Sequence, residues 1–288
     1  MFRIAINGFG RIGRNIVRAI HERPELLESI QIVAINDLGD SRVNGHLLSF
    51  DTVHGRFNQE VEASDDAIFI NGEKIKWFSE RNPADLPWGE LDVDLVCECT
   101  GFFTDRDKAD LHIQAGAKKV LVSAPGKGLD ATIVFGINDD VLTSKHQIIS
   151  NASCTTNCLA PMAKVLNENF GIHLGVINTI HAYTNDQRLA DVPHSDWRMS
   201  MAAAENVIPP TTGAARAVGV VLPELNGKLD GIAMRVPVPD GSVVDFNVQL
   251  DANVTVDQIN EAVREASING SLKGILEYST LPVVSSDI

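Results

Sequence analysis

The sequence predicts an α/β protein: a Rossmann-type dinucleotide-binding domain over residues 1–152, followed by an α+β domain with a mostly antiparallel sheet over residues 153–288. In the first half, short apolar strand-like segments alternate with amphipathic helical ones, which is typical of a parallel sheet covered by helices. In the second half, strand-like segments flank one long helical pattern. We therefore expect the first domain to hold a cofactor and the second to be a catalytic domain that holds substrate.

Local patterns predict the individual elements. An Asn-Gly pair at 71–72 separates two strand-like runs and favours a two-residue hairpin turn. Cys97 and Cys99 lie two apart on a predicted strand, so they share one face and are expected to pack in the core. Predicted helices cover 14–20, 107–115 and 254–268, and predicted strands cover 2–7, 31–36, 65–70, 73–78, 91–101 (ending in a turn), 119–126 (strand and loop), 132–136, 175–182, 231–237 and 242–250.

A glycine-rich turn follows the first strand and opens a helix, with the spacing G-x-G-x-x-G. Gly8 allows the tight turn, Gly10 lets the backbone approach a pyrophosphate, and Gly13 lets the helix pack on the strand. The first residues of the helix, including Arg11 and Ile12, offer backbone N–H groups to the phosphates. The motif in this context predicts a dinucleotide site.

Further residues at the ends of strands are expected to border the same ligand, because doubly wound sheets bind ligands beyond the carboxyl ends of their strands. Asp37 ends the second strand, and its carboxylate suits a ribose 2′-hydroxyl but repels a 2′-phosphate, so the cofactor is expected to be NAD rather than NADP. Thr100 and Gly101 end one later strand, and Ser123 ends another. Arg81, in a loop, either reaches the adenosine side or is a solvated surface residue.

Composition and charge exclude several classes of function. Hydrophobic residues make up 44% and charged residues 22%, as in soluble globular proteins, and the formal charge of −14 argues against a nucleic-acid or anionic-membrane surface. The four cysteines have neither the pattern of a disulfide framework nor the spacing of zinc ligands. The chain begins directly as a strand, with no signal peptide and no apolar run of membrane length. We expect a cytoplasmic protein with no metal site.

The stretch from Ser150 to Cys158 has the pattern of a helix N-terminus, because small capping residues precede an apolar helical run. Cys154 is predicted in the first helical turn. There, unpaired backbone N–H groups and the helix dipole favour its thiolate. The alternative is a buried structural cysteine. The complete dinucleotide site earlier in the chain favours a catalytic nucleophile.

The chain resembles the glyceraldehyde-3-phosphate dehydrogenase family along its whole length. The motifs that carry the resemblance are Ala5–Arg14, Ser150–Pro161, Thr212–Ala215, Pro223–Leu229 and Met234–Pro237. The resemblance implies a homotetramer that oxidises glyceraldehyde 3-phosphate with NAD and inorganic phosphate to give 1,3-bisphosphoglycerate. The cysteine motif is the most specific of these stretches.

The resemblance also implies roles for residues of the second half. Cys154 forms a hemithioacetal and then a thioester, and His181 is the base. The attacking phosphate is assigned to Ser153, Thr155, Thr212 and Gly213. The phosphate of the substrate is assigned to Thr184, Asp186 and Arg235. Ionised Asp186 cannot bind phosphate directly, so we expect it to orient a neighbouring donor.

Two alternatives and two departures accompany this interpretation. The alternatives are an erythrose-4-phosphate dehydrogenase, which Thr184 and Asp186 match less well, and a catalytically impaired relative that binds NAD or forms oligomers. Met199 and Met201 stand where relatives carry further arginines, so weaker phosphate binding is expected. Family members continue for several tens of residues beyond the position of Ile288, and a chain that ends there is expected to be less stable and less active.

Overall fold

The computed structural model describes residues 1–288, which form two compact units. The first unit contains Met1–Thr132 and Leu142–Ala152, and the second contains Ile133–Val141 and Ser153–Ile288. The segment Ile133–Val141 thus clusters with the second unit although strands of the first unit precede and follow it. No helix is both long enough and apolar enough to cross a membrane.

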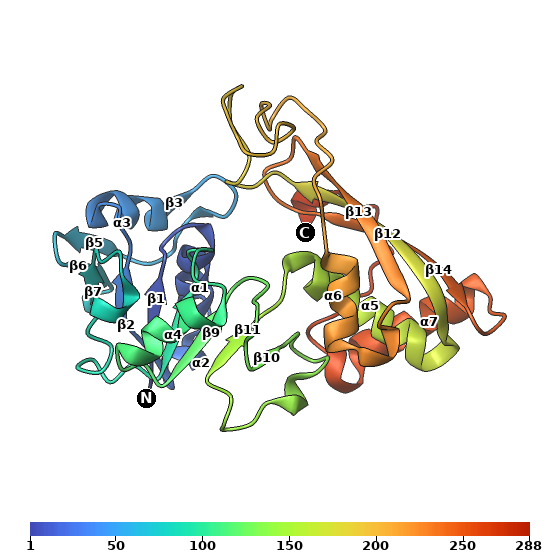
Figure 1. Ribbon diagram of the computed structural model, residues 1–288, viewed down its shortest axis with the longest axis horizontal. Coiled ribbons are helices and arrows are strands. Elements are labelled where there is room, and N and C mark those ends of the chain that lie inside the picture. Colours follow the sequence, from blue (N-terminus) through green and yellow to red (C-terminus); the bar gives the residue numbers. More distant parts are fainter. The chain divides into compact units, whose positions relative to one another are not determined.

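The first unit is built on a nine-stranded sheet in the order β10-β11-β9-β8-β1-β2-β7-β6-β5 (Figure 1). β1 pairs in parallel with β2 on one side and with β8 on the other. The strand order therefore reverses at β1, and the carboxyl ends of β1 and β8 form a topological switch point, where such sheets bind ligands. The strands are β1 (Phe2–Asn7), β2 (Ile30–Asn36), β5 (Val61–Ser64), β6 (Ala67–Ile70), β7 (Glu73–Phe78), β8 (Leu95–Glu98), β9 (Lys119–Val122), β10 (Ala131–Thr132) and β11 (Ile148–Ser150).

Four α-helices and a small second sheet complete this unit. The helices are α1 (Arg11–His21), α2 (Pro24–Leu27), α3 (Ser41–Ser49) and α4 (Arg106–Gln114), with one 3-10 turn, η1 (Pro83–Asp85). The small sheet pairs β3 (Phe50–Asp51) with β4 (Gly55–Arg56). The expected strand over 132–136 is wrong beyond Thr132, where β10 ends. The next residues leave the first unit, so they have no neighbouring strand to pair with.

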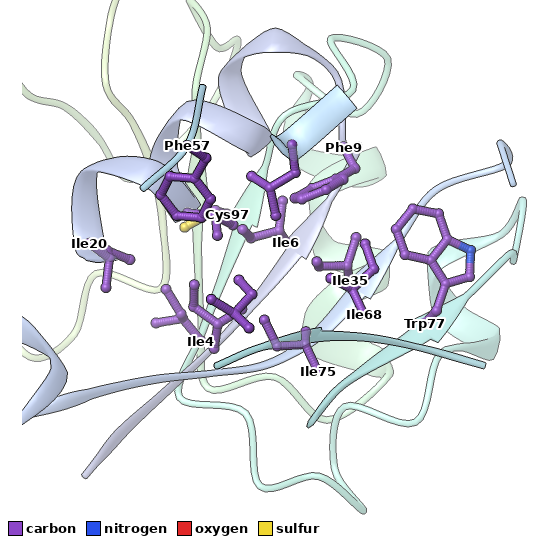
Figure 2. Close-up of a cluster of buried hydrophobic side chains, with 14 residues drawn as sticks. Ile4, Ile6, Phe9, Ile20, Ile35, Phe57, Ile68, Ile75, Trp77 and Cys97 are labelled. Atoms are coloured by element: carbon purple, nitrogen blue, oxygen red, sulfur yellow. The ribbon is translucent and has the colours of Figure 1, made fainter. Parts of the chain in front are cut away.

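The main core of the first unit lies between α1 and one face of the sheet (Figure 2). Phe9 and Trp77 meet edge to face with their ring centroids 5.8 Å apart. Cys97 belongs to this cluster and Cys99 packs against it, which confirms that both cysteines face the core. The hairpin between β6 and β7 is also confirmed. Its turn has φ of 51° at Asn71 and 82° at Gly72, which fits the expected Asn-Gly turn.

The second unit contains a three-stranded sheet in the order β13-β12-β14, with α5 and α6 packed against it (Figure 1). The expected antiparallel pairing joins β12 to β14, and β13 adds a parallel pairing on the other side of β12. Residues 183–213 contain no regular helix or strand. The elements are α5 (Cys154–Phe170), β12 (Ile172–Ala182), α6 (Ala214–Val221), β13 (Leu229–Val236), β14 (Val243–Leu250), α7 (Val256–Ile268), and the 3-10 turns η2 (Asp139–Val141), η3 (Pro223–Leu225), η4 (Gly270–Leu272) and η5 (Ser285–Asp287).

Candidate active site and cofactor site

Cys154 is the first residue of α5, as its sequence context predicts. Ser153 caps the helix, and its hydroxyl accepts a hydrogen bond from the backbone N–H of Thr156 at 3.0 Å. Ala152 precedes the cap with φ of 58°, a left-handed conformation that is uncommon for a residue with a side chain. The chain therefore turns sharply into the helix, and the cysteine lies among the unpaired N–H groups of its first turn.

His181, on β12, faces the cysteine. Its Nε2 lies 3.1 Å from Sγ of Cys154. The hydrogen bond with His181 is the largest influence and lowers the pKa of Cys154, and the backbone and hydroxyl of Thr155 contribute in the same direction, while burial opposes them. The arrangement favours a thiolate, which is the nucleophilic form of cysteine.

The other three cysteines differ in this respect. Burial raises the pKa of Cys97 to about 12 and that of Cys99 to about 11. Burial also raises the pKa of Cys158, and a thiolate at Cys154 adds to that shift. Cys154 is thus the only cysteine of the chain whose surroundings favour the thiolate.

The other nitrogen of His181 is held by a backbone carbonyl to which Arg235 also donates. Nδ1 lies 2.6 Å from the carbonyl oxygen of Ala182, close enough to donate a hydrogen bond to it. Arg235 is the register partner of His181 on β13, and its Nη1 contacts Nδ1 and donates to the same carbonyl at 3.1 Å. With its Nδ1 side held in this way, the imidazole presents Nε2 to Cys154.

Arg235 combines a positive charge with an unused donor. Burial lowers its pKa, and the negative charges of Cys154 and Asp186 oppose that effect. Its Nε is buried and has no hydrogen-bond partner within the protein. A buried, unpaired N–H on a guanidinium is costly unless a ligand accepts from it, so Arg235 is suited to bind an anion.

Thr184 and Asp186 lie in the loop after β12. The backbone N–H of Thr184 donates to Oε1 of buried Gln187 at 3.3 Å, and the N–H of Gln187 donates back to the carbonyl of Thr184 at 3.0 Å. Asp186 is exposed, with Oδ1 3.7 Å from Nε2 of His194. Both predicted residues thus belong to one turn, which is closed by Gln187, a residue that the sequence did not single out.

The starts of α5 and α6 lie next to each other. The hydroxyl of Thr156 donates to the carbonyl of Ala214 at 3.4 Å, and Thr212 accepts from the N–H of Ala214 at 3.2 Å. Gly213 caps α6 without a side chain. The structure thus brings Ser153 and Thr155 near Thr212 and Gly213, where two helix N-termini provide N–H groups. The Thr155 side chain is mostly buried.

Met199 and Met201, the two departures from the expected pattern, lie in different surroundings. Met199 is buried and its carbonyl accepts from the N–H of Arg188 at 3.4 Å, whereas Met201 is 43% exposed. An arginine is therefore easily accommodated only at position 201.

In the first unit, the glycine turn has the tight geometry that its spacing predicts. Gly8 has φ of 90°, and a Cβ there would lie 2.7 Å from the backbone nitrogen of Thr100. A Cβ on Gly13 would lie 2.3 Å from the carbonyl oxygen of Gly8. A Cβ on Gly10 would meet nothing within 4 Å. Gly8 and Gly13 are therefore required by the fold, while the space beside Gly10 is open for a ligand to approach the backbone.

Two carboxylates support this turn. Asp37 accepts hydrogen bonds from the N–H of Phe9 at 2.7 Å and from the N–H of Gly39 at 2.8 Å, which still leaves lone pairs for a ligand hydroxyl. Arg11 is exposed and forms an ion pair with Asp51. Burial alone would raise the pKa of Asp51, but hydrogen bonds from backbone N–H groups and the charge of Arg11 outweigh it and lower the pKa to about 2.

Of the remaining predicted cofactor residues, Thr100, Gly101 and Ser123 lie at the ends of β8 and β9. Gly101 is exposed with φ of 77°, next to Thr100, whose hydroxyl accepts from the N–H of Phe102 at 3.0 Å. The N–H of Ser123 donates to the carbonyl of Glu98 at 3.0 Å. Ile12 and Arg81 are exposed, Ile12 at the start of α1 and Arg81 in the loop after β7.

A buried polar network that the sequence did not predict lies beneath these turns. It joins the side chains of Asn7, Asn36, Trp88, Glu98 and His112. The only signal was that β1, β2 and β8 each run through apolar residues into a polar last residue, Asn7, Asn36 and Glu98. Two exposed apolar side chains, Leu38 and Phe102, lie beside the predicted cofactor residues and were also not predicted.

Comparisons with known proteins give one consistent result. Residues 2–106 match the family described as "Glyceraldehyde 3-phosphate dehydrogenase, NAD binding domain", and residues 153–288 match "Glyceraldehyde 3-phosphate dehydrogenase, C-terminal domain". The chain is similar to the glyceraldehyde-3-phosphate dehydrogenases of Streptomyces coelicolor (58% identity), Pseudomonas aeruginosa (55%) and Geobacillus stearothermophilus (54%). Each of these alignments covers 99% of this chain and 84% of the relative.

Proposed function

Because the chain belongs to the glyceraldehyde-3-phosphate dehydrogenase family, we propose that it oxidises glyceraldehyde 3-phosphate to 1,3-bisphosphoglycerate, with NAD as oxidant and inorganic phosphate as second substrate. The observation that carries the proposal is the 3.1 Å contact between Sγ of Cys154 and Nε2 of His181 at a helix N-terminus. In this proposal residues 1–152 bind the cofactor and residues 153–288 bind the substrates.

The reaction begins on Cys154. His181 accepts the thiol proton at Nε2, and the thiolate attacks the aldehyde carbon, so that a C–S bond forms and the carbonyl oxygen takes the proton. The product is a hemithioacetal. The lowered pKa of Cys154 means that little free energy is needed to form the thiolate at neutral pH.

Oxidation of the hemithioacetal requires removal of a proton and a hydride. Nε2 of His181 takes the hydroxyl proton, while Nδ1 donates its hydrogen to the carbonyl of Ala182, which also accepts from Arg235. Bound NAD supplies the hydride acceptor. Loss of the proton and the hydride oxidises the former aldehyde carbon by two electrons and leaves a thioester on Cys154.

Inorganic phosphate then attacks the thioester carbon, and the C–S bond breaks to release the thiolate and the acyl phosphate. We assign Ser153, Thr155, Thr212 and Gly213 to this phosphate. The support is that the starts of α5 and α6 are joined through Thr156 and Ala214, so their N–H groups are near one another.

For the phosphate of the substrate we assign Thr184 and Arg235, with Asp186 orienting a neighbouring donor. The unpaired Nε of Arg235 supports this assignment, because it is a buried cationic donor without a partner in the protein. Asp186 is near enough to His194, at 3.7 Å, to orient that ring.

The cofactor residues are proposed to be Gly8, Gly10, Arg11, Ile12, Gly13, Asp37, Arg81, Thr100, Gly101 and Ser123. The residues fit NAD, because a Cβ at Gly10 would fill open space beside the helix N-terminus and Asp37 retains acceptor capacity for ribose hydroxyls. A 2′-phosphate would meet the negative charge of Asp37, which favours NAD over NADP.

We also propose that the protein is cytoplasmic, which its four free cysteines favour, and that it forms a homotetramer. The support is the sheet of the second unit, whose strands leave apolar side chains about half exposed at Leu174, Val176, Ile232 and Val243. A row of apolar residues of this kind is typical of an interface between subunits. Sedimentation velocity at micromolar concentration tests it, and a monomer would contradict it.

Steady-state kinetics test the proposed function. We expect reduction of NAD that needs both glyceraldehyde 3-phosphate and phosphate, with erythrose 4-phosphate a poorer substrate. Cys154→Ser is the matched control and is expected to lose activity by several orders of magnitude. Equal rates with erythrose 4-phosphate, or activity that survives in Cys154→Ser, would contradict the proposal.

A further inference from the structure

We propose that the buried pair of Glu98 and His112 is a positioning device that holds two NAD-binding turns, Asn7–Gly8 and Thr100–Gly101, in their binding conformation. The inference rests on the proposed role of these turns in binding NAD. Neither side chain is required by the chemistry described above. Both residues are buried, with exposed fractions of 1% for Glu98 and 0% for His112.

The carboxylate of Glu98 accepts four hydrogen bonds. Oε2 accepts from Nδ2 of Asn7 at 2.5 Å and from Nε2 of His112 at 3.0 Å. Oε1 accepts from the hydroxyl of Thr100 and from its backbone N–H at 2.8 Å. The carboxylate donates no hydrogen bond, so both of its oxygens act only as acceptors and all four acceptor sites are in use.

His112 is locked in one tautomer by Trp88. The indole Nε1 can only donate, and it lies 3.0 Å from Nδ1 of His112, so Nδ1 must accept. The hydrogen of the neutral imidazole is then on Nε2, where it is donated to Glu98. Nδ2 of Asn7 lies 3.4 Å from Nε2 because both donors converge on the same carboxylate oxygen.

The pair lies at the switch point of the sheet. Asn7 and Glu98 are register partners at the ends of β1 and β8. The turn of Gly8 follows Asn7 directly, and the Gly8 backbone is so close to Thr100 that an added Cβ would be 2.7 Å from its nitrogen. The carboxylate of Glu98 therefore bonds both Asn7, the last residue of β1, and Thr100, in the turn after β8.

The network also extends to the neighbouring turns. Asn7 accepts from Nδ2 of Asn36 at 2.7 Å, and Asn36 exchanges hydrogen bonds with the backbone of Glu80, next to Arg81. The hydroxyl of Thr100, which donates to Glu98, accepts from Phe102 across Gly101. Three cofactor turns are thus tied to one buried carboxylate.

Stability alone does not account for this arrangement. A buried charged or polar cluster is often no more stabilising than well-packed apolar residues of similar volume, but its hydrogen bonds fix directions that apolar packing leaves free. Every donor to Glu98 other than His112 belongs to a residue that adjoins a cofactor turn. We therefore expect loss of the pair to weaken NAD binding more than chemistry.

The test is NAD binding to the full chain by isothermal titration calorimetry, with steady-state kinetics on the same samples. Glu98→Gln replaces one acceptor oxygen by a donor, so the contacts either to Thr100 or to Asn7 and His112 are lost. We expect its Kd and KM for NAD to rise about 10- to 100-fold, the range expected when hydrogen bonds to a charged group are lost. We expect kcat at saturating NAD and KM for glyceraldehyde 3-phosphate to stay within about threefold of wild type.

Variants of His112 provide a second, independent measurement. His112→Leu removes the donor and is expected to weaken NAD binding as Glu98→Gln does. In His112→Gln the amide nitrogen can reach the position of Nε2, so binding is expected to recover toward wild type. If Glu98→Gln does not fold, the comparison of His112→Leu with His112→Gln decides the question.

Val96→Ala is the matched control, because Val96 is fully buried on the same face of β8 but donates nothing to either turn. It is expected to lower the melting temperature and to leave the Kd for NAD unchanged. A wild-type Kd in Glu98→Gln and His112→Leu, or a weakening as large in Val96→Ala, would overturn the proposal.

Binding and activity separate this inference from the proposed function. Wild-type protein that binds NAD but does not oxidise glyceraldehyde 3-phosphate contradicts the proposed function, and the Kd comparison still decides this inference. Wild-type protein that does not bind NAD overturns both.

Discussion

Sγ of Cys154 and Nε2 of His181 lie 3.1 Å apart although the two residues are separated by 27 positions in the chain. The cysteine begins α5 and the histidine lies near the end of β12, the strand that follows this helix. The helix therefore runs away from the site and the strand returns to it. The contact explains why one thiol among four has a lowered pKa.

Alkylation measures this contact directly. At pH 7 we expect iodoacetamide to modify Cys154 first, because its pKa is lowered while those of the other three cysteines are raised. In His181→Asn the main stabilising contact is lost, so the midpoint of the rate against pH moves upward and the rate at pH 7 falls about tenfold or more. Peptide mass mapping identifies the modified residue. An unchanged pH profile in His181→Asn would show that the helix terminus alone activates the thiol.

The glycine turn provides a test that separates fold from cofactor binding. Gly10→Ala is expected to keep the free energy of unfolding within about 1 kcal/mol, because its Cβ meets nothing within 4 Å, but to weaken NAD binding strongly. Gly13→Ala is the contrasting variant, since its Cβ would lie 2.3 Å from the carbonyl of Gly8 and must distort the turn. Urea unfolding and calorimetric titration with NAD measure both effects. Tight NAD binding in Gly10→Ala would mean that the cofactor does not approach this backbone.

Arg235 contacts His181 and is also proposed to bind the substrate phosphate, and the two roles predict different results. Arg235→Lys keeps the charge but loses the planar guanidinium, which can bind two phosphate oxygens at once. KM for glyceraldehyde 3-phosphate is therefore expected to rise about tenfold or more. Unphosphorylated glyceraldehyde should be affected much less. The alkylation rate of Cys154 is the control: if it falls as in His181→Asn, Arg235 acts chiefly through the imidazole.

Acid is expected to remove the stabilising effect of Asp51. Its folded pKa of about 2 is below the ordinary value of 3.8, so its contribution is fully present above about pH 4 and is lost as the pH falls toward 2. The lowered pKa of Asp51 corresponds to about 1 to 2 kcal/mol in the free energy of unfolding, and the lower figure allows for solvent screening of the exposed Arg11. Urea unfolding of wild type and Asp51→Asn should differ most above pH 5 and converge near pH 2. A difference that does not vary with pH would contradict this account.

Features that depend on neighbouring residues in the chain could be predicted from the sequence. The spacing of Gly8, Gly10 and Gly13 predicted the turn, and the Asn-Gly pair predicted the hairpin of β6 and β7. Ser153 before Cys154 predicted the helix start. Backbone conformation and helix capping are local, so the residue types specify them directly.

Features that depend on contacts between distant segments appeared only in the tertiary structure. His181 was selected by family resemblance, and only the return of β12 brings its ring to the cysteine. The parallel pairing of β13 with β12 sets Arg235 beside His181, and the register of β1 and β8 joins Asn7 to Glu98. The strand expected over 132–136 was wrong because a partner strand, rather than local pattern, decides where β10 ends. By itself the sequence determined the turns, the helix starts and the types of side chain available for chemistry. The pairing of strands decided which of these side chains come into contact. Hydrogen bonds between side chains require atoms within about 3 Å of each other, and no local pattern specifies that distance.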